Sequence, residues 1–157
     1  MSKQIIDRFA GKHFFLSNFY NATVHYGGHT YRNNEAAFQA QKCPERATEF
    51  EELDPSEAKK LGRKVSLRPD WESVKVRVMY EVCLDKFTTN PDLRTKLLGT
   101  GDARLVEGNT WGDTYWGMYH GRGSNMLGNI LMIIRDELRV ERRLDDTVVV
   151  WPPFFSP

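Results

Sequence analysis

Residues 33–42 decide the fold, and they read Asn33-Asn34-Glu35-Ala36-Ala37-Phe38-Gln39-Ala40-Gln41-Lys42. An asparagine at the start can cap a helix, because its side-chain oxygen accepts a hydrogen bond from a free backbone N–H. Positions 35, 38, 39 and 42 recur at helical spacing, so one face carries Glu35, Phe38, Gln39 and Lys42. The stretch therefore predicts a short helix, ending near Pro44, that presents a carboxylate and an amine on the same side.

The polar face of this helix has two interpretations. The axial distance from Glu35 to Lys42 is about 10 Å, so both long side chains can reach one sugar-sized ligand. Glutamate, glutamine and lysine at such spacing are more often typical of a helix face in contact with solvent. The pattern alone favours the solvated face.

The surrounding sequence predicts a β-hairpin before this helix and mainly helices after it. Gly27-Gly28 separates two short β-type runs, residues 22–26 and 29–32, as in a two-residue hairpin turn. The other expected elements are helices over residues 46–53, 55–62, 71–87, 91–98 and 127–138, a strand over 104–107 and a possible final strand within 147–157. We therefore predict an α+β fold, compact and mainly helical, with few strands and a single domain over residues 1–157.

The clearest amphipathic helix of the first half is expected after Pro69. Asp70 stands at its start as a cap, and Trp71, Val74, Val78 and Val82 follow at helical spacing. We therefore predict that this helix packs one apolar side against the core.

A second group of chemically useful residues lies between residues 105 and 117. It contains two carboxylates, Glu107 and Asp113, and two indoles, Trp111 and Trp116, in a glycine-rich loop. Indoles in such a loop can stack against a planar base, worth roughly 1 to 3 kcal/mol per base, or fill the core from outside. Both interpretations fit each tryptophan equally well.

A third group, Gly121-Arg122-Gly123-Ser124-Asn125, leads directly into the C-terminal helix. Free backbone N–H groups, a positive helix end and an arginine can hold a phosphate there, although a flexible lead-in with an asparagine cap is the alternative. The glycine spacing matches neither a dinucleotide fingerprint nor a Walker loop.

Composition excludes several classes of function. Lys and Arg number 22 against 21 for Asp and Glu, a net charge of +1, so tight non-specific nucleic-acid binding is not expected. The two cysteines form no disulfide framework, and the four histidines lack paired metal-ligand spacing. We expect no metal, no cofactor and no membrane segment, and a cytoplasmic location.

Several segments together resemble the NADAR family, also called YbiA-like. In the first half these are Phe15-Leu16-Ser17-Asn18-Phe19, Glu35-x-x-Phe38-Gln39-Ala40-Gln41-Lys42, Leu61-Gly62-Arg63, Asp70-Trp71-Glu72-x-Val74-Lys75 and Lys86-Phe87. In the second half they are Leu105-Val106-Glu107, Asp113-x-x-Trp116-Gly117 and Gly123-x-Asn125-x-Leu127-Gly128-x-x-Leu131-Met132-x-x-Arg135. The resemblance spans nearly the whole chain, from residue 15 to about residue 138.

The resemblance implies a mainly helical α+β domain in which the Glu35 helix, Trp71, Glu107 and the loop from Asp113 to Trp116 form one pocket. It also implies cleavage of an N-glycosidic bond on a phosphorylated ribosyl substrate. Family members act on ribosylamino-pyrimidine phosphates of the riboflavin pathway or on ADP-ribose attached to guanine, so either substrate is a possible partner.

The resemblance also suggests roles for individual residues. Glu35 is the first candidate for the catalytic carboxylate and Asp113 the second, because cleavage builds positive charge at C1′. Lys42 is a candidate nucleophile that forms a Schiff base with C1′, provided that its pKa is lowered. The predicted substrate contacts are Trp71 and Trp116 to the base, Arg63, Lys75 and Arg122 to the phosphate, Asn18 and Asn125 to the ribose, and Phe19, Glu107, Gly117 and Gly123 as further lining.

Three other functions remain open from the sequence. The same pocket can bind ADP-ribose or a nucleotide without turnover, or reverse ADP-ribosylation of a flipped or single-stranded guanine, as an antitoxin does. An inactive structural homologue is the third, and the presence of Glu35, Asp113 and Lys42 counts against it.

Overall fold

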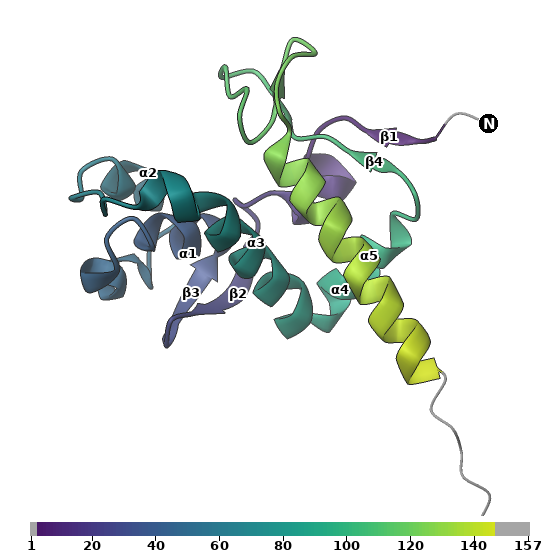
Figure 1. The fold of residues 1–157 in the computed structure, drawn as a ribbon, viewed down its shortest axis with the longest axis horizontal. Helices are drawn as coiled ribbons and strands as arrows, with labels where there is room; N and C mark the ends of the chain where they lie inside the picture. Colours follow the sequence, from purple (N-terminus) through teal and green to yellow (C-terminus); the bar gives the residue numbers. More distant parts are fainter. Residues whose placement is uncertain (1–2, 147–157) are drawn as a thin grey trace, which may run out of the picture.

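The structure is a computed structural model that describes residues 3–146, and α3 (Trp71–Thr89) is its central element (Figure 1). The other helices are η1 (Gly11–Leu16), α1 (Asn34–Ala40), η2 (Pro44–Phe50), α2 (Pro55–Gly62), α4 (Pro91–Gly99) and α5 (Met126–Asp146), where η marks a 3-10 helix. Helix α3 contacts α1, α4, α5 and strand β2 (Asn21–Tyr26), so it connects the two ends of the fold.

The strands are short and pair two by two. Strand β2 pairs with β3 (His29–Asn33) in an antiparallel hairpin, β1 (Ile5–Ile6) pairs in parallel with β4 (Arg104–Leu105), and β5 (Gly108–Asn109) pairs in parallel with β6 (Met118–Tyr119). Both hairpin-turn glycines have positive φ, 57° for Gly27 and 83° for Gly28, as expected for the two-residue turn that the Gly27-Gly28 pair predicts. The predicted α+β, mainly helical fold is confirmed.

Helix α1 is buried along its whole length, because α2, α3, β2, β3 and η2 surround it. Asn33 caps the helix, its side-chain oxygen accepting a hydrogen bond from Ala36 N at 2.8 Å. The interpretation of its polar face as solvated is wrong, since Glu35 is only 7% exposed and Gln39 only 5% exposed. The three alanines of α1 are fully buried and allow the neighbouring elements to approach closely.

Helix α3 buries one apolar side as predicted, because Trp71, Val78 and Val82 are at most 6% exposed while Glu72, Ser73 and Arg77 are exposed. Its buried side includes the cation Lys86, which is 1% exposed, and partly buried residues such as Val76 and Tyr80 extend the contact around the helix. Neighbours on several sides explain this wide contact surface. Asp70 does not cap α3 with its side chain, because its carboxylate pairs with Arg68 at 2.6 Å instead.

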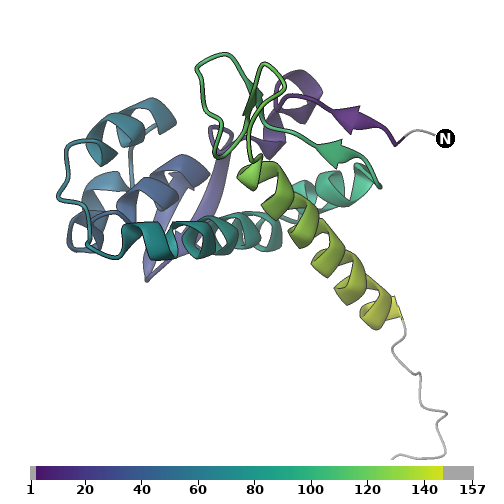
Figure 2. The ribbon, with the colours of Figure 1, turned by 45° about the horizontal axis from the view of Figure 1, so that its top comes forward.

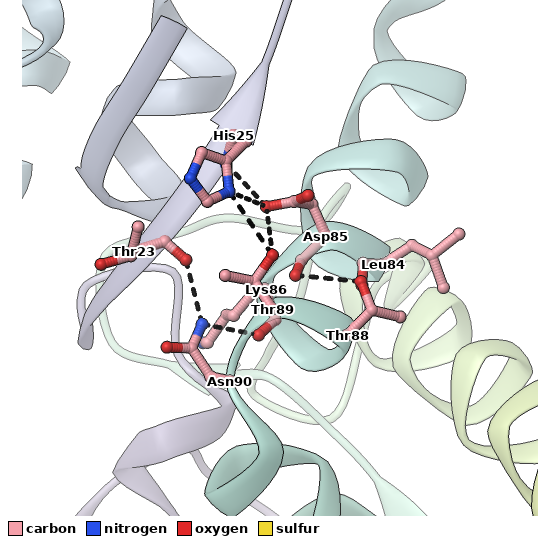
Figure 3. A network of polar contacts seen from close by, with 8 residues as sticks. All are labelled: Thr23, His25, Leu84, Asp85, Lys86, Thr88, Thr89 and Asn90. Carbon is pink, nitrogen blue, oxygen red and sulfur yellow. Dashed lines mark hydrogen bonds and ion pairs between the residues drawn. The ribbon is translucent and has the colours of Figure 1, made fainter.

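The last turn of α3 is joined to β2 by a polar network, drawn in Figure 3. Asp85 Oδ2 accepts hydrogen bonds from the backbone N–H of His25 at 2.6 Å and from the Thr89 hydroxyl at 3.2 Å. Asn90 donates to the carbonyl oxygens of Thr23 at 2.9 Å and Lys86 at 2.8 Å. These bonds fix the hairpin against α3.

Most of the remaining expected boundaries agree with the structure. Asp54 caps α2 by accepting a hydrogen bond from Glu57 N at 2.8 Å. The helix expected over residues 46–53 is the shorter 3-10 helix η2, and the strand expected over 104–107 ends at Leu105. The possible strand within residues 147–157 lies outside the described residues. Figure 2 shows the loop between β4 and α5 standing above the first turn of α5.

Candidate active site

One cavity of about 570 Å³ collects side chains from both halves of the chain. Its helical wall comprises Glu35, Phe38 and Gln39 from α1, Lys42 from the turn that follows α1, Lys59 from α2, and Trp71, Lys75 and Met79 from α3. The predicted continuation of the first of these helices through residue 42 is wrong, because α1 ends at Ala40. Its loop wall comprises Glu107, Trp111, Asp113 and Trp116, and the N-terminal segment adds Phe9, Phe14, Ser17, Asn18 and Phe19. The first two groups predicted from sequence therefore meet at one cavity.

Glu35 is the most deeply placed acid of the helical wall. Its Oε1 accepts a hydrogen bond from Gln39 Nε2 at 2.8 Å, one helical turn later. Burial raises the pKa of this carboxyl group, while the Gln39 bond and the charges of Lys59 and Lys42 oppose the increase. Gly62 of α2 packs against the Gln39 side chain so closely that a methyl group there would overlap its Oε1. The glycine thus permits the arrangement that orients Glu35.

Lys42 lies at the C-terminal end of the same face. Its Nζ is 5.9 Å from the centroid of the Trp71 ring, within range of a cation–π contact. Burial lowers the pKa of Lys42, the nearby Glu35 raises it, and the charges of Arg63 and Lys59 lower it further. A lysine in this environment is a better nucleophile than an exposed one.

The aromatic side chains form a connected group. Phe38 contacts Trp71 and Trp116 with ring centroids 5.1 and 5.4 Å apart. Trp116 packs against the core and also lines the cavity, so it helps to fill the core, and base stacking by this tryptophan stays a prediction. Trp111 is 62% exposed at the cavity, which excludes a role in filling the core.

Asp113 is held by its own loop. Its Oδ1 accepts hydrogen bonds from the backbone N–H groups of Tyr115 at 3.0 Å and Trp116 at 2.9 Å. Asn109 bonds both the N–H and the carbonyl oxygen of Asp113, at 3.0 and 2.8 Å. The loop wall is therefore built from side-chain to backbone hydrogen bonds rather than from regular structure.

Glu107 is held from behind the cavity by Asn125. The Asn125 Oδ1 accepts a hydrogen bond from Glu107 N at 3.0 Å, and its Nδ2 donates to Leu105 O at 2.9 Å. Asn125 itself has a positive φ of 50°, a conformation that asparagine tolerates better than most residues. Burial, followed by the charges of Asp113 and Glu35, raises the pKa of Glu107 to about 8.

Two lysines of the helical wall differ in their partners. Lys75 already pairs with Glu72 at 2.6 Å and lies 4.2 Å from the centroid of the Tyr115 ring, so it links α3 to the loop. Lys59 lies 6.0 Å from the centroid of the Phe19 ring. Sequence reasoning missed Lys59, although the small residues Ala58 and Gly62 beside it mark the side of α2 that packs inward.

Five of the predicted site residues lie outside the cavity lining: Arg63, Gly117, Arg122, Gly123 and Asn125. Both amide atoms of Asn125 bond backbone groups, and the residue is 3% exposed and outside the cavity lining, so a ribose contact by Asn125 is not supported. The N–H groups at the start of α5 are also occupied, because Met126 N and Leu127 N donate to Tyr115 O and Trp116 O. These bonds argue against a phosphate at the start of α5, and Arg122 is exposed outside the cavity lining.

The remaining predicted residues lie at the cavity. Asn18 accepts a hydrogen bond from Asn34 Nδ2 at 2.8 Å and is 8% exposed, while Phe19 is 36% exposed at the rim. Within residues 3–146, no three His, Cys, Asp or Glu side chains are grouped as metal ligands. No helix of the described part of the chain is long and apolar enough to cross a membrane.

Comparisons with known proteins agree with this geometry. A family model described as the NADAR domain matches residues 7–139. The N-glycosidase YbiA of Escherichia coli (strain K12) is 41% identical over 134 residues, covering 81% of this chain and 82% of that protein. A riboflavin biosynthesis protein of Vibrio vulnificus is 36% identical over 133 residues, covering 81% of this chain and 36% of that longer protein.

The fold also matches a solved structure. The NMR structure of E. coli YbiA superimposes with a TM-score of 0.80 and 37% identity, covering 91% of this chain and 89% of the other. Similarity of this extent, over most of both chains, makes the protein an N-glycosyl hydrolase. It belongs to the NADAR domain family.

Proposed function

We propose that this enzyme hydrolyses the C1′–N bond of a phosphorylated ribosylamine, with a ribosylamino-pyrimidine phosphate as the substrate. The observation that carries the proposal is the buried Glu35 carboxyl group, which lines the same cavity as indoles and lysines. The name of the Vibrio vulnificus relative, a riboflavin biosynthesis protein, supports this substrate class over ADP-ribosylated guanine.

The reaction places positive charge on the anomeric carbon as the C1′–N bond lengthens. A carboxylate in a cavity that excludes water stabilises this charge more strongly than it would in bulk solvent. Glu35 is the residue for this role in the proposal: burial raises the pKa of its carboxyl group, and the hydrogen bond from Gln39 together with the charges of Lys59 and Lys42 opposes that increase. Asp113 is the second carboxylate available to orient or activate the water molecule.

The two ends of the substrate have different requirements. In this proposal the indoles of Trp71 and Trp116 enclose the planar base, which is supported by their lining the cavity and contacting Phe38. Lys42 and Lys59, which also line the cavity, meet the phosphate in this proposal, and the charge of Arg63 acts on Lys42 from outside the lining. Lys75 contributes less to phosphate binding in this proposal, because Glu72 already neutralises it.

A covalent variant of the mechanism uses Lys42. The ring of a glycosylamine opens to an imine, and a neutral Lys42 amine then attacks C1′ to form a Schiff base. Burial favours the neutral amine by lowering the pKa of Lys42. Borohydride trapping tests this route: a Lys42→Ala enzyme with nearly full turnover, and no adduct trapped on the unsubstituted enzyme, eliminates it.

A parallel assay tests the proposed function. The protein is incubated separately with a ribosylamino-pyrimidine phosphate, ADP-ribosylated guanosine, NAD and ADP-ribose, and the released sugar phosphate is measured. Ribose 5-phosphate from the first substrate, with much slower cleavage of the others, is the expected result. Preferred cleavage of ADP-ribosylated guanosine contradicts the proposed substrate, and binding without any turnover contradicts the catalytic proposal itself.

A further inference from the structure

Cleavage of the C1′–N bond needs a proton as well as a carboxylate. The departing nitrogen takes the bonding electron pair, and an amine attached to a base is a poor leaving group unless it is protonated. General acid catalysis of this kind contributes roughly 10²- to 10⁴-fold to a rate. An acid that is still protonated near neutral pH must therefore lie in the cavity.

Glu107 has the geometry of such an acid. Its side chain lines the cavity, and its Oε2 is buried without a hydrogen-bond partner among residues 3–146. An unpaired buried oxygen is costly unless a ligand supplies the partner. Gly117 lies directly against this carboxyl group, since a Cβ atom there would stand 2.8 Å from Oε2. The surroundings thus restrict where the carboxyl group can point.

The charged groups around Glu107 come from every neighbouring element. They are Glu35 from α1, Lys42 from the turn after α1, Lys59 from α2, Lys75 from α3 and Asp113 from the loop, and the thiol of Cys83 on α3 is a further titratable group with a pKa raised to about 11. Burial and the charges of Asp113 and Glu35 disfavour ionisation of Glu107 and raise its pKa to about 8. The charge of Lys59 acts against this increase. Burial raises the pKa of Glu35 as well, but there the hydrogen bond from Gln39 and the charges of Lys59 and Lys42 oppose the increase.

We propose that Glu107 is the general acid of this enzyme and delivers its proton to the nitrogen that departs from C1′. The proposal rests on the proposed function and adds a division of labour between two carboxyl groups. Water adds to C1′ and gives one proton to Glu35 or Asp113, the C1′–N bond breaks with its electron pair on nitrogen, and Glu107 transfers its proton to that nitrogen. The products are the sugar hemiacetal and the free amine, and solvent returns the proton from the base to Glu107.

The first test compares pH profiles of the unsubstituted enzyme, Glu107→Gln and Glu107→Asp on a ribosylamino-pyrimidine phosphate. We expect kcat of the unsubstituted enzyme to fall as pH rises through about 8, because Glu107 then loses its proton. Glu107→Gln should lose about 100-fold or more in kcat with little change in KM, and its remaining activity should not fall above pH 8. Glu107→Asp should recover part of the rate and the alkaline decrease.

The second test measures the proton directly. In protein with ¹³C-labelled glutamate, the carboxyl signal that is missing from Glu107→Gln belongs to Glu107, and we expect it to titrate near pH 8. Titration near the ordinary value of 4.5 overturns the proposal, as does a Glu107→Gln enzyme that keeps its kcat and its alkaline decrease. An unsubstituted enzyme that cleaves none of the substrates overturns the proposed function instead.

Discussion

The helical wall and the loop wall of the cavity each contribute carboxyl groups, but they hold them in different ways. The Glu35 carboxyl group accepts a hydrogen bond from Gln39 on the same helix, and the charges of Lys59 and Lys42 act on it. Glu107 is held through its backbone N–H by Asn125, 18 residues away, and the charges of two other carboxyl groups act on its side chain. The difference teaches that burial raises the pKa of both carboxyl groups, but a side-chain hydrogen bond and two lysine charges oppose the increase at Glu35, whereas only the charge of Lys59 opposes it at Glu107.

The largest expected effect comes from the acid of the helical wall. Glu35→Gln should lower kcat by roughly 10²- to 10⁴-fold, because the amide keeps the shape and removes the negative charge near C1′. The matched control is Glu52→Gln, an exposed glutamate whose ion pair with Arg32 is 3.8 Å long. Equal activity of the two variants would remove Glu35 from the mechanism.

A smaller effect is expected when the loop wall is disturbed without removing an acid. Gly117→Ala places a methyl group against the Glu107 carboxyl group and its carbonyl oxygen, and should lower kcat by about tenfold or more, as small misplacements of catalytic groups do. Gly99→Ala is the control, since a Cβ atom there has open space within 4 Å among the described residues. Steady-state kinetics of folded protein check this prediction.

The corresponding glycine of the helical wall sharpens the comparison. Gly62→Ala meets the end of the Gln39 side chain, which is flexible and can move aside. Glu35 then loses one hydrogen bond but keeps its lysines, so kcat should fall less than in Gly117→Ala. A greater loss in Gly62→Ala would contradict the view that the loop wall is the less tolerant one.

Phosphate recognition should depend on Lys59 and should appear in KM. Lys59→Ala should raise KM for the phosphorylated substrate by about tenfold, the usual cost of one hydrogen bond to a charged group. The same substitution should leave KM for the unphosphorylated ribosylamine unchanged, whereas kcat for both substrates should shift together because the Lys59 charge acts on Glu35 and Glu107. Lys60→Ala is the matched control, because Lys60 is exposed on the same helix.

The smallest expected effect is on the free energy of unfolding, whose pH dependence should reflect the raised pKa of Glu107 in the loop wall. Because the folded state raises the pKa of Glu107 from 4.5 to about 8, its carboxyl group contributes stability below pH 4.5 that is lost as pH rises to about 8. Urea unfolding of the unsubstituted protein and Glu107→Gln should therefore favour the variant increasingly between these pH values. Parallel pH curves for the two proteins would contradict the raised pKa.

The sequence predicted the helical wall better than the loop wall, for a physical reason. Periodicity fixes which side chains share a helix face, so helical spacing alone is enough to put Glu35 and Lys42 on the same side. Whether that face meets solvent or a cavity depends on the elements that cover α1, and the pattern alone indicated the wrong alternative.

The loop wall contains no such periodicity. Its shape comes from hydrogen bonds between side chains and distant backbone groups, such as those of Asn125 to Leu105 and Glu107. The sequence identified Asn125 and Gly117 as site residues but assigned them to substrate contact, whereas they lie behind the cavity and hold Glu107. Lys59 was missed because its only signal is indirect: the small residues Ala58 and Gly62 mark the side of α2 that packs inward, but they do not show that a cavity lies there.

A ligand-bound structure tests the central claim most directly. Crystals of Glu35→Gln with an intact ribosylamino-pyrimidine phosphate should show C1′ beside residue 35, the departing nitrogen beside Glu107 and the phosphate near Lys42 and Lys59. A substrate bound outside this cavity, or bound inside it with C1′ away from residue 35, would contradict the account.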